Sequence, residues 1–167
     1  MSNRVVEVVL ERIPESVEAF KMLLEEKQEN EFEVAALTVA ALCVYPKDKQ
    51  ASLDMLNALR GPRELSQFDI QFIRDRFMDG KDYVPRSYFK GATPENDYTV
   101  SEPYIVAVEE NPYTREQEGY SKLFLKSGGA DSPRYVQLRL AKNGRWYLWE
   151  QFLLSDIRPP ESTNFWA

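Results

Sequence analysis

The fold is decided by residues 135–150, which read YVQLRLAKNGRWYLWE. Apolar and polar residues alternate on both sides of Asn143-Gly144, and such a pair between two alternating runs is a strong signal for a β-hairpin. Asn and Gly tolerate the positive φ that both central residues of a type I′ turn require. The stretch therefore predicts two antiparallel strands joined by a two-residue loop, with Leu138 opposite Trp149 and Gln137 opposite Glu150.

This register assigns the side chains to two faces of the sheet, because successive residues of a strand point to opposite sides. We expect one face to line the core; it carries Val136, Leu138, Leu140, Tyr147 and Trp149. The other face is mixed and carries Gln137, Arg139, Ala141, Trp146, Leu148 and Glu150. Trp146 is then the exposed aromatic residue of the hairpin, unless a helix covers its face and makes it part of the core.

The composition is that of an ordinary globular protein. The chain has 167 residues, of which 43% are hydrophobic and 29% charged, and a net charge of −6. We expect a single domain over residues 1–167. No apolar run approaches the roughly 20 residues that a membrane span needs, and the N-terminal run has no signal-peptide cleavage pattern. The lone cysteine, Cys43, fits a reducing cytoplasm.

The charge is unevenly distributed along the chain. Residues 1–119 contain 14 Lys/Arg and 23 Asp/Glu, whereas residues 120–158 contain 7 and 3. The two parts either attract one another and solvate their own faces, or the basic part forms a sheet that binds an anionic partner.

The first half of the chain predicts helices. Residues 4–10 are rich in valine, and they fit either an edge strand or the start of a helix. Ser16 or Pro14 starts a helix, residues 34–44 read as a buried central helix, and Asp48 caps a third. Ser66 and Asp69 resemble a capping box for a fourth helix. Its expected inner face consists of Phe68, Phe72, Ile73 and Phe77.

The second half predicts an antiparallel sheet. Strand-like runs occupy residues 104–109 and 120–126 ahead of the two hairpin strands, and residues 83–103 form a long aromatic connection. Helices segregated from an antiparallel sheet make an α+β domain. We therefore predict an N-terminal cluster of three to four helices packed on a C-terminal four-stranded meander.

Several sequence blocks resemble a known family. They are GPRELS (61–66), FIRDRF (72–77), SYFKGATPENDY (87–98), SGGADSPR (127–134) and WYLWEQFLLSDIR (146–158). Together they resemble an uncharacterised family of small bacterial proteins, mostly from Firmicutes, over roughly residues 34–167. The resemblance implies a stand-alone bacterial cytoplasmic domain and carries over no catalytic residue. The family pattern has proline where this chain has Val100, so the turn after Asp97-Tyr98 is expected to differ.

The residue inventory excludes several kinds of chemistry. The chain contains no histidine, which removes Ser-His-Asp and Cys-His catalysis and His-ligated metals. One cysteine cannot make a Cys-rich metal site, and Cys43 lies in an apolar helix where a thiol is normally inert. Ser127-Gly128-Gly129 lacks the lysine and helix of a phosphate-binding loop, and we read it as a turn. We expect no cofactor and no metal.

Carboxylates are the remaining acid–base groups. A small hydrolase or transferase would use a pair from Glu95, Asp97, Glu150 and Asp156, because glycoside-type chemistry needs two carboxyl groups about 5–9 Å apart. Nothing in the sequence brings two of them together, so we do not expect an enzyme.

The best positive signal is the aromatic and basic hairpin. We predict a cytoplasmic, non-enzymatic binding domain whose partner is another protein or a second copy of itself. Its candidate contact residues are Tyr88, Phe89, Arg139, Trp146 and Arg158. A second alternative is single-stranded nucleic acid stacked on the Trp146 face, which the acidic net charge disfavours. We expect no membrane partner.

Overall fold

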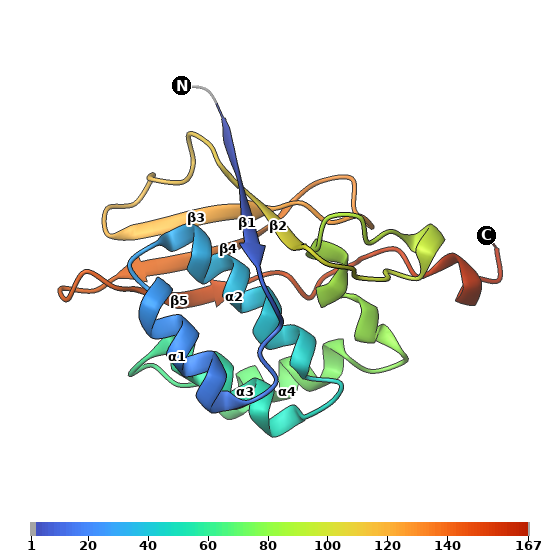
Figure 1. Cartoon of the computed structure of the whole chain (residues 1–167), viewed down its shortest axis with the longest axis horizontal. Helices are drawn as coiled ribbons and strands as arrows, with labels where there is room; N and C mark the ends of the chain where they lie inside the picture. Colours follow the sequence, from blue (N-terminus) through green and yellow to red (C-terminus); the bar gives the residue numbers. More distant parts are fainter. Residues whose placement is uncertain (1–2, 167) are drawn as a thin grey trace.

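The computed structural model describes residues 3–166 and has four α-helices and a five-stranded antiparallel sheet (Figure 1). The strands follow one another across the sheet in chain order: β1 (Arg4–Leu10), β2 (Tyr104–Glu110), β3 (Tyr120–Leu125), β4 (Arg134–Leu140) and β5 (Trp146–Gln151). The predicted α+β class is confirmed. The sheet has one strand more than we predicted, because residues 4–10 pair with β2 along their whole length.

Each helix begins at a side-chain cap. The helices are α1 (Val17–Lys27), α2 (Glu31–Val44), α3 (Lys49–Arg60) and α4 (Gln67–Arg76), with caps at Ser16, Asn30, Asp48 and Ser66. The Ser66–Asp69 capping box is present as predicted. Four short 3₁₀ turns complete the chain: η1 (Lys81–Tyr83), η2 (Pro85–Tyr88), η3 (Pro94–Asn96) and η4 (Glu161–Thr163). Within residues 3–166, no helix has the length and apolarity required to cross a bilayer.

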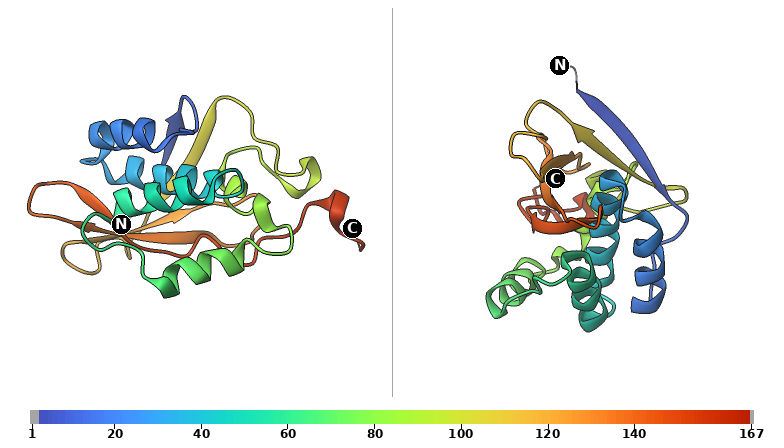
Figure 2. Two further views of the ribbon diagram at one scale, coloured as in Figure 1. Left: turned by 90° about the horizontal axis from the view of Figure 1, so that it is seen from below. Right: turned by 90° about the vertical axis from the view of Figure 1, so that its left-hand side faces the viewer.

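Helix α2 is the centre of the core. It is buried on nearly every side, as its continuous apolar sequence predicts, and it contacts all five strands. Helices α1 and α3 flank it on the same side of the sheet (Figure 2). Its alanines, Ala35, Ala36, Ala40 and Ala41, are fully buried and allow this close packing.

The turn of the β4–β5 hairpin has three residues, not the predicted two. The Ala141 amide donates to the Arg145 carbonyl, and the Gly144 amide donates to the Ala141 carbonyl. Gly144 has a φ of 82°, whereas Asn143 has no positive φ. This is a type I turn followed by a left-handed glycine, which is also compatible with Asn-Gly.

The extra turn residue shifts the register next to the turn by one position. Leu138 pairs with Leu148 and Arg139 with Tyr147, and the predicted pairing returns only at Gln137–Glu150, beyond a bulge at Trp149. A shift of one residue exchanges the two faces of a strand. The predicted faces of β5 were therefore wrong: Leu148 is buried, Trp146 packs half-buried against the core, and Tyr147 and Trp149 lie on the opposite face.

Helix α4 and the residue that follows it bury only half of the inner face that we predicted. Ile73 and the following Phe77 are buried, whereas Phe68 is 77% exposed and Phe72 38% exposed. The sequence does not distinguish the two pairs, since Phe68–Phe72 and Ile73–Phe77 both have the i, i+4 spacing of one helical stripe. α4 lies beyond the β5 edge, away from the layer of α1 and α2 (Figure 2), and this position leaves room for only one stripe to be buried.

Tyrosine hydroxyls attach the segment that follows β5. Tyr88 donates to the Leu153 carbonyl at 2.6 Å and Tyr83 to the Ile157 carbonyl at 3.1 Å, while Tyr98 donates to the Arg158 carbonyl. The long connection 83–103 is thus packed against residues 153–158 and contributes buried side chains to the core.

Removing one of these hydroxyls should destabilise the fold. Tyr88→Phe leaves the buried Leu153 carbonyl without its donor, and we expect the free energy of unfolding to fall by about 1–2 kcal/mol. Urea denaturation measures this loss. Tyr113→Phe removes a hydroxyl from a side chain that is 60% exposed and should change stability by less than about 0.5 kcal/mol; equal losses in both variants would contradict the attachment.

Alkaline pH should weaken the same attachment. Burial, with a smaller contribution from Tyr83, raises the pKa of Tyr98 from 10.0 to about 12. Between these values the unfolded chain releases the proton and the folded chain keeps it, so stability should fall as the pH rises from 10 to 12. Urea titrations of the wild type and Tyr98→Phe across this range test the sign: the fall should be shallower in the variant, and parallel curves would contradict it.

Candidate functional site

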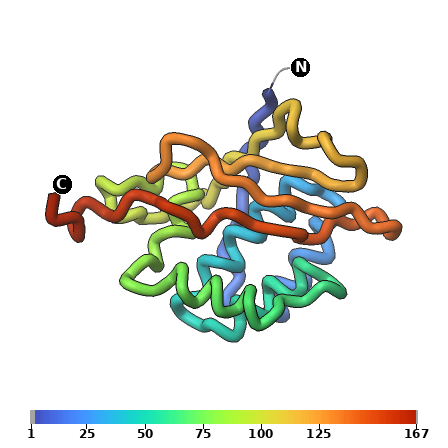
Figure 3. The backbone as a smooth tube through the Cα atoms, turned by 180° about the vertical axis from the view of Figure 1, so that it is seen from behind, coloured from blue at the N-terminus to red at the C-terminus, as the bar shows by residue number. Residues whose placement is uncertain are grey.

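The face of the sheet opposite α2 is the candidate site. Strands β3, β4 and β5 lie in front of the helices when the molecule is seen from behind (Figure 3). Burial alternates along β3 and along β4 from Tyr135 to Arg139, whereas in β5 it is interrupted after the buried Leu148. The side chains that point away from the core are half-buried or exposed. Tyr147 lies on this side with its ring against Gly61. Five further aromatic residues on this side form what we call the outer aromatic face; they are Tyr120, Phe124, Tyr135, Trp149 and Phe152.

The rings of the outer aromatic face contact one another across the strands. Tyr120 and Trp149 meet edge to face, with ring centroids 5.7 Å apart. Tyr135 lies between Phe124 at 5.8 Å and Phe152 at 4.7 Å. Such pairs fix ring positions and stabilise neighbouring strands. The bulge at Trp149 makes this possible, because the added residue turns Phe152 to the same side as Tyr135.

Cationic side chains cover parts of these rings. Arg63 lies 4.0 Å above the Trp149 ring and Arg139 4.8 Å from it, while Lys122 lies 4.8 Å above Tyr135. Arg63 also pairs with Glu150 at 3.0 Å. The face therefore combines aromatic rings with positive groups, and a carboxylate lies at its edge.

An apolar groove between α4 and β5 continues this face. Its volume is about 270 Å³, and its lining includes Phe68, Phe72, Leu148 and Phe152. Phe152 is 47% exposed and belongs both to the groove and to the outer aromatic face. One aromatic surface therefore runs from α4 to β3.

A charged pair borders the groove. The Arg60 guanidinium lies 3.7 Å from the Asp69 carboxylate. Burial raises the pKa of Asp69, but the hydrogen bonds from Ser66 and the charge of Arg60 outweigh it and hold that pKa below its usual value. Burial and the charge of Arg63 lower the pKa of Arg60. The groove therefore has an ionised Arg60–Asp69 pair at its border, next to its apolar lining.

The five contact residues that we predicted lie in different places. Tyr88 and Phe89 are in the core, 1% and 2% exposed. Trp146 is on the α2 side of the sheet, and Arg158 pairs with Asp131 at 3.0 Å beside the segment after β5. Of the five, Arg139 belongs to the outer aromatic face.

The four candidate carboxylates are spread over three segments. Glu95 and Asp97 are exposed at the η3 turn. Glu150 lines the α4 groove and is paired with Arg63, whereas Asp156 lines a separate hollow of about 260 Å³ beside Tyr83 and Val84. Neither of these two hollows holds two of the four.

The Ser127–Gly129 turn and the potential metal ligands were the other groups that we considered as sites. The Gly128 amide donates to the Ser87 carbonyl and the Gly129 amide to the Ser127 hydroxyl, so this turn uses its own donors internally. In residues 3–166, no three potential metal-ligating side chains are grouped around one point.

Sequence reasoning missed the aromatic residues that form the surface. Trp149 was assigned to the core by the predicted register, and Phe68 and Phe72 by the helical pattern. Phe152 stands alone after the hairpin in Gln151-Phe152-Leu153, where no alternation identifies its face. The sequence offered one signal: Phe68–Phe72 and Ile73–Phe77 form two separate apolar stripes on α4, and one of two such stripes can remain exposed.

Comparison with known proteins identifies a family and no characterised relative. The model of a family described as "Domain of unknown function (DUF6935)" matches residues 12–161. No curated protein and no solved structure matches the chain.

Cys43 offers a test of whether the chain holds a reactive nucleophile. Desolvation raises the pKa of its thiol from 9.0 to about 12, and Arg86 offsets only part of this. Little thiolate exists near neutral pH, so iodoacetamide should alkylate Cys43 much more slowly at pH 8 than it alkylates free cysteine. Mass spectrometry follows the reaction, with urea-unfolded protein as the control. Alkylation of the folded protein as fast as the unfolded would contradict the shift.

Proposed function

The chain belongs to the DUF6935 family of domains of unknown function, and we propose that it is a non-enzymatic domain that binds another protein through the outer aromatic face and the α4 groove. The observation that carries this proposal is the continuity of the surface. Phe68 and Phe72 on α4 share the groove with Phe152, and the Phe152 ring contacts that of Tyr135 on the sheet at a tilt, with centroids 4.7 Å apart.

The composition of this surface favours a protein partner. Trp, Tyr and Phe, together with Arg, are the residues enriched where proteins bind one another, and they supply most of the binding free energy. Phe68, at 77% exposure, and Phe152, at 47%, offer apolar area that binding would remove from water. Such area, next to an ionised pair, resembles the core and rim of an interface.

Charge disfavours nucleic acid as the occupant. Arg63, Arg139 and Lys122 could approach phosphates, but each already covers a ring, and the chain has a net charge of −6. Phosphate contacts dominate nucleic-acid affinity, so an acidic protein whose few cations are engaged is a poor candidate.

Binding is also favoured over acid–base catalysis. Glu150 is ion-paired, and Glu95, Asp97 and Asp156 lie on other segments, so that no two of these four carboxylates flank one hollow among those described above. Asp69, which shares the α4 groove with Glu150, is itself ion-paired with Arg60. We place this domain in the bacterial cytoplasm, on the basis of the family resemblance and the lone Cys43.

Matched surface variants test the proposal. Phe152→Ser and Phe68→Ser remove exposed rings from the surface, whereas Leu140→Ser makes the same kind of change at a residue that is 42% exposed and outside it. Immobilised wild type and Leu140→Ser should retain the same protein from a bacterial lysate. We expect each Phe variant to lower the affinity for that purified partner about ten-fold or more.

Two measurements decide the outcome. Thermal melts establish that the variants are folded, because Phe152→Ser also loses its contact with Tyr135. Sedimentation of the wild type alone establishes whether the partner is a second copy. Equal affinity of all four proteins for the partner would rule out this surface.

A further inference from the structure

Strand β1 ends the sheet and has one neighbour. The strand order places it at the edge, paired with β2 alone. It is seven residues long and contains four valines. Exposed valine-rich edge strands are templates for pairing with another chain.

The free backbone groups of β1 can be identified from the opposite side of β2. There the Ile105 carbonyl accepts from the Lys90 amide and the Ala107 carbonyl from the Lys126 amide, so Ile105 and Ala107 direct their backbone groups away from β1. In an antiparallel pair, residues that face each other either exchange hydrogen bonds or both point away. Val9 and Glu7 face Ile105 and Ala107. Their N–H and C=O groups therefore point away from β2 at the free edge of the sheet, as do those of Val5 two residues earlier.

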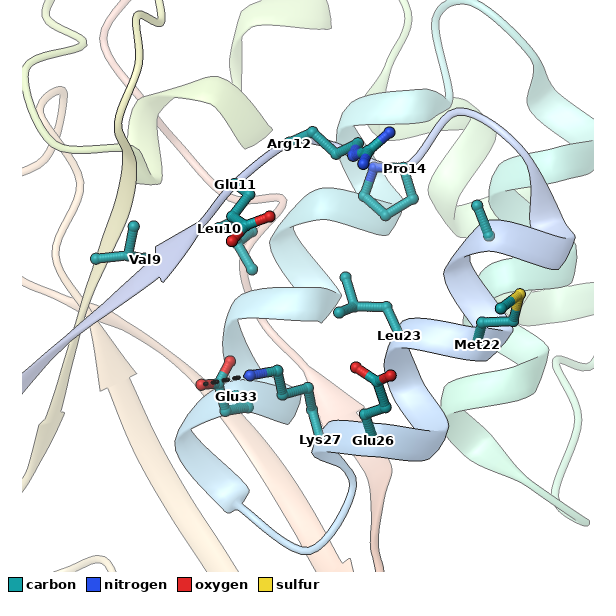
Figure 4. Close-up of a pocket in the computed structure, with 11 residues that line it drawn as sticks. Val9, Leu10, Glu11, Arg12, Pro14, Met22, Leu23, Glu26, Lys27 and Glu33 are labelled. Atoms are coloured by element: carbon teal, nitrogen blue, oxygen red, sulfur yellow. Dashed lines mark ion pairs between the residues drawn. The ribbon is translucent and has the colours of Figure 1, made fainter.

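A groove runs beside this edge. It lies between the end of β1 and α1, with α2 at its back, and has a volume of about 460 Å³ (Figure 4). Leu10 and Leu23 contribute apolar lining, and Met22 is 71% exposed. This volume falls in the range of ligand-binding clefts.

The charges at the groove and the edge select the occupant. The groove lining carries three carboxylates, Glu11, Glu26 and Glu33, and two cations, Arg12 and Lys27. Lys27 pairs with Glu33 at 3.8 Å, and the groove keeps an excess of one negative charge. On the strand, Glu7 makes an exposed contact with Lys90 at 2.8 Å, and such contacts are weak. A basic segment is therefore complementary to this side of the molecule.

The same glutamate disfavours a second copy of the chain. A two-fold pairing of β1 centred on Glu7 places this carboxylate opposite its own copy, and like charges directly opposite each other destabilise a sheet. Charges on an edge strand are a known protection against self-pairing.

We propose that β1 binds an extended segment of another protein as a sixth strand. A basic side chain of that segment lies opposite Glu7, and the apolar side chains on either side of it point toward α1 and enter the groove. Backbone hydrogen bonds to Val5, Glu7 and Val9 hold the segment, as in other cases of β-strand addition. This site lies at the opposite edge of the sheet from the α4 groove and does not depend on it.

A synthetic peptide tests the site directly. The probe is Thr-Leu-Thr-Val-Lys-Leu-Thr with blocked termini, and its matched control has Glu in place of Lys. Amide shifts in NMR spectra of the labelled protein should move for Val5, Glu7 and Val9 and for Met22 and Leu23 on α1. The Lys peptide should bind about three-fold more tightly than the Glu peptide, as expected for one cross-strand charge pair.

Two variants distinguish strand addition from other contacts. Val5→Pro removes an outward N–H and spares the ladder to β2, because proline is tolerated where the donor faces water; it should weaken peptide binding about five-fold. Glu7→Lys should reverse the preference between the two peptides. Phe152→Ser should leave the affinity unchanged.

Several results would overturn the inference. They are an absence of shifts on β1 at millimolar peptide, equal binding by Val5→Pro, and an unreversed preference in Glu7→Lys. Concentration-dependent dimerisation that Val5→Pro abolishes would assign the edge to a second copy instead.

Discussion

The backbone conformation of Gly144 determines which aromatic residues of the hairpin are buried. Its φ of 82° closes a three-residue turn, and the turn sets the pairing of β4 with β5. Leu148 and Trp146 consequently pack toward α2, and Trp149 joins Tyr120 on the other side. The bulge at Trp149 then restores the register and turns Phe152 outward beside Tyr135. One left-handed residue and one added residue thus bring Trp149 and Phe152 to the side of the sheet that carries Tyr120 and Tyr135.

The rest of the core supports this arrangement from the other side of the sheet. α2 fills the inner face with small and branched side chains, so the rings of the sheet have their room on the outer face. The connection 83–103 and the segment 153–158 are joined by tyrosine hydroxyls, which fixes the chain directly after Phe152. The position of α4 beyond β5 leaves Phe68 and Phe72 next to that residue. The two edges of the sheet thereby differ: β5 adjoins aromatic rings, and β1 presents free backbone groups.

Features that depend on local chemistry could be predicted from the sequence. Asp48 and the Ser66–Asp69 box are caps because of atoms within four residues, and the all-round apolar residues 34–44 could only be buried. Asn143-Gly144 predicted a hairpin correctly but is compatible with two turn lengths, which place opposite faces inward. On α4, the stripes Phe68–Phe72 and Ile73–Phe77 are equally apolar, and the location of the helix in the fold decides between them. The β1 strand was ambiguous because its partner, β2, lies about a hundred residues away.

Cross-strand nuclear Overhauser effects in the hairpin test the central claim most directly. The three-residue turn predicts contacts between the backbone protons of Arg139 and Tyr147 and of Leu138 and Leu148, together with ring contacts between Tyr120 and Trp149. A two-residue turn would instead give contacts between Arg139 and Leu148 and between Leu138 and Trp149. Observation of this second set would place Trp149 in the core and take it out of the outer aromatic face.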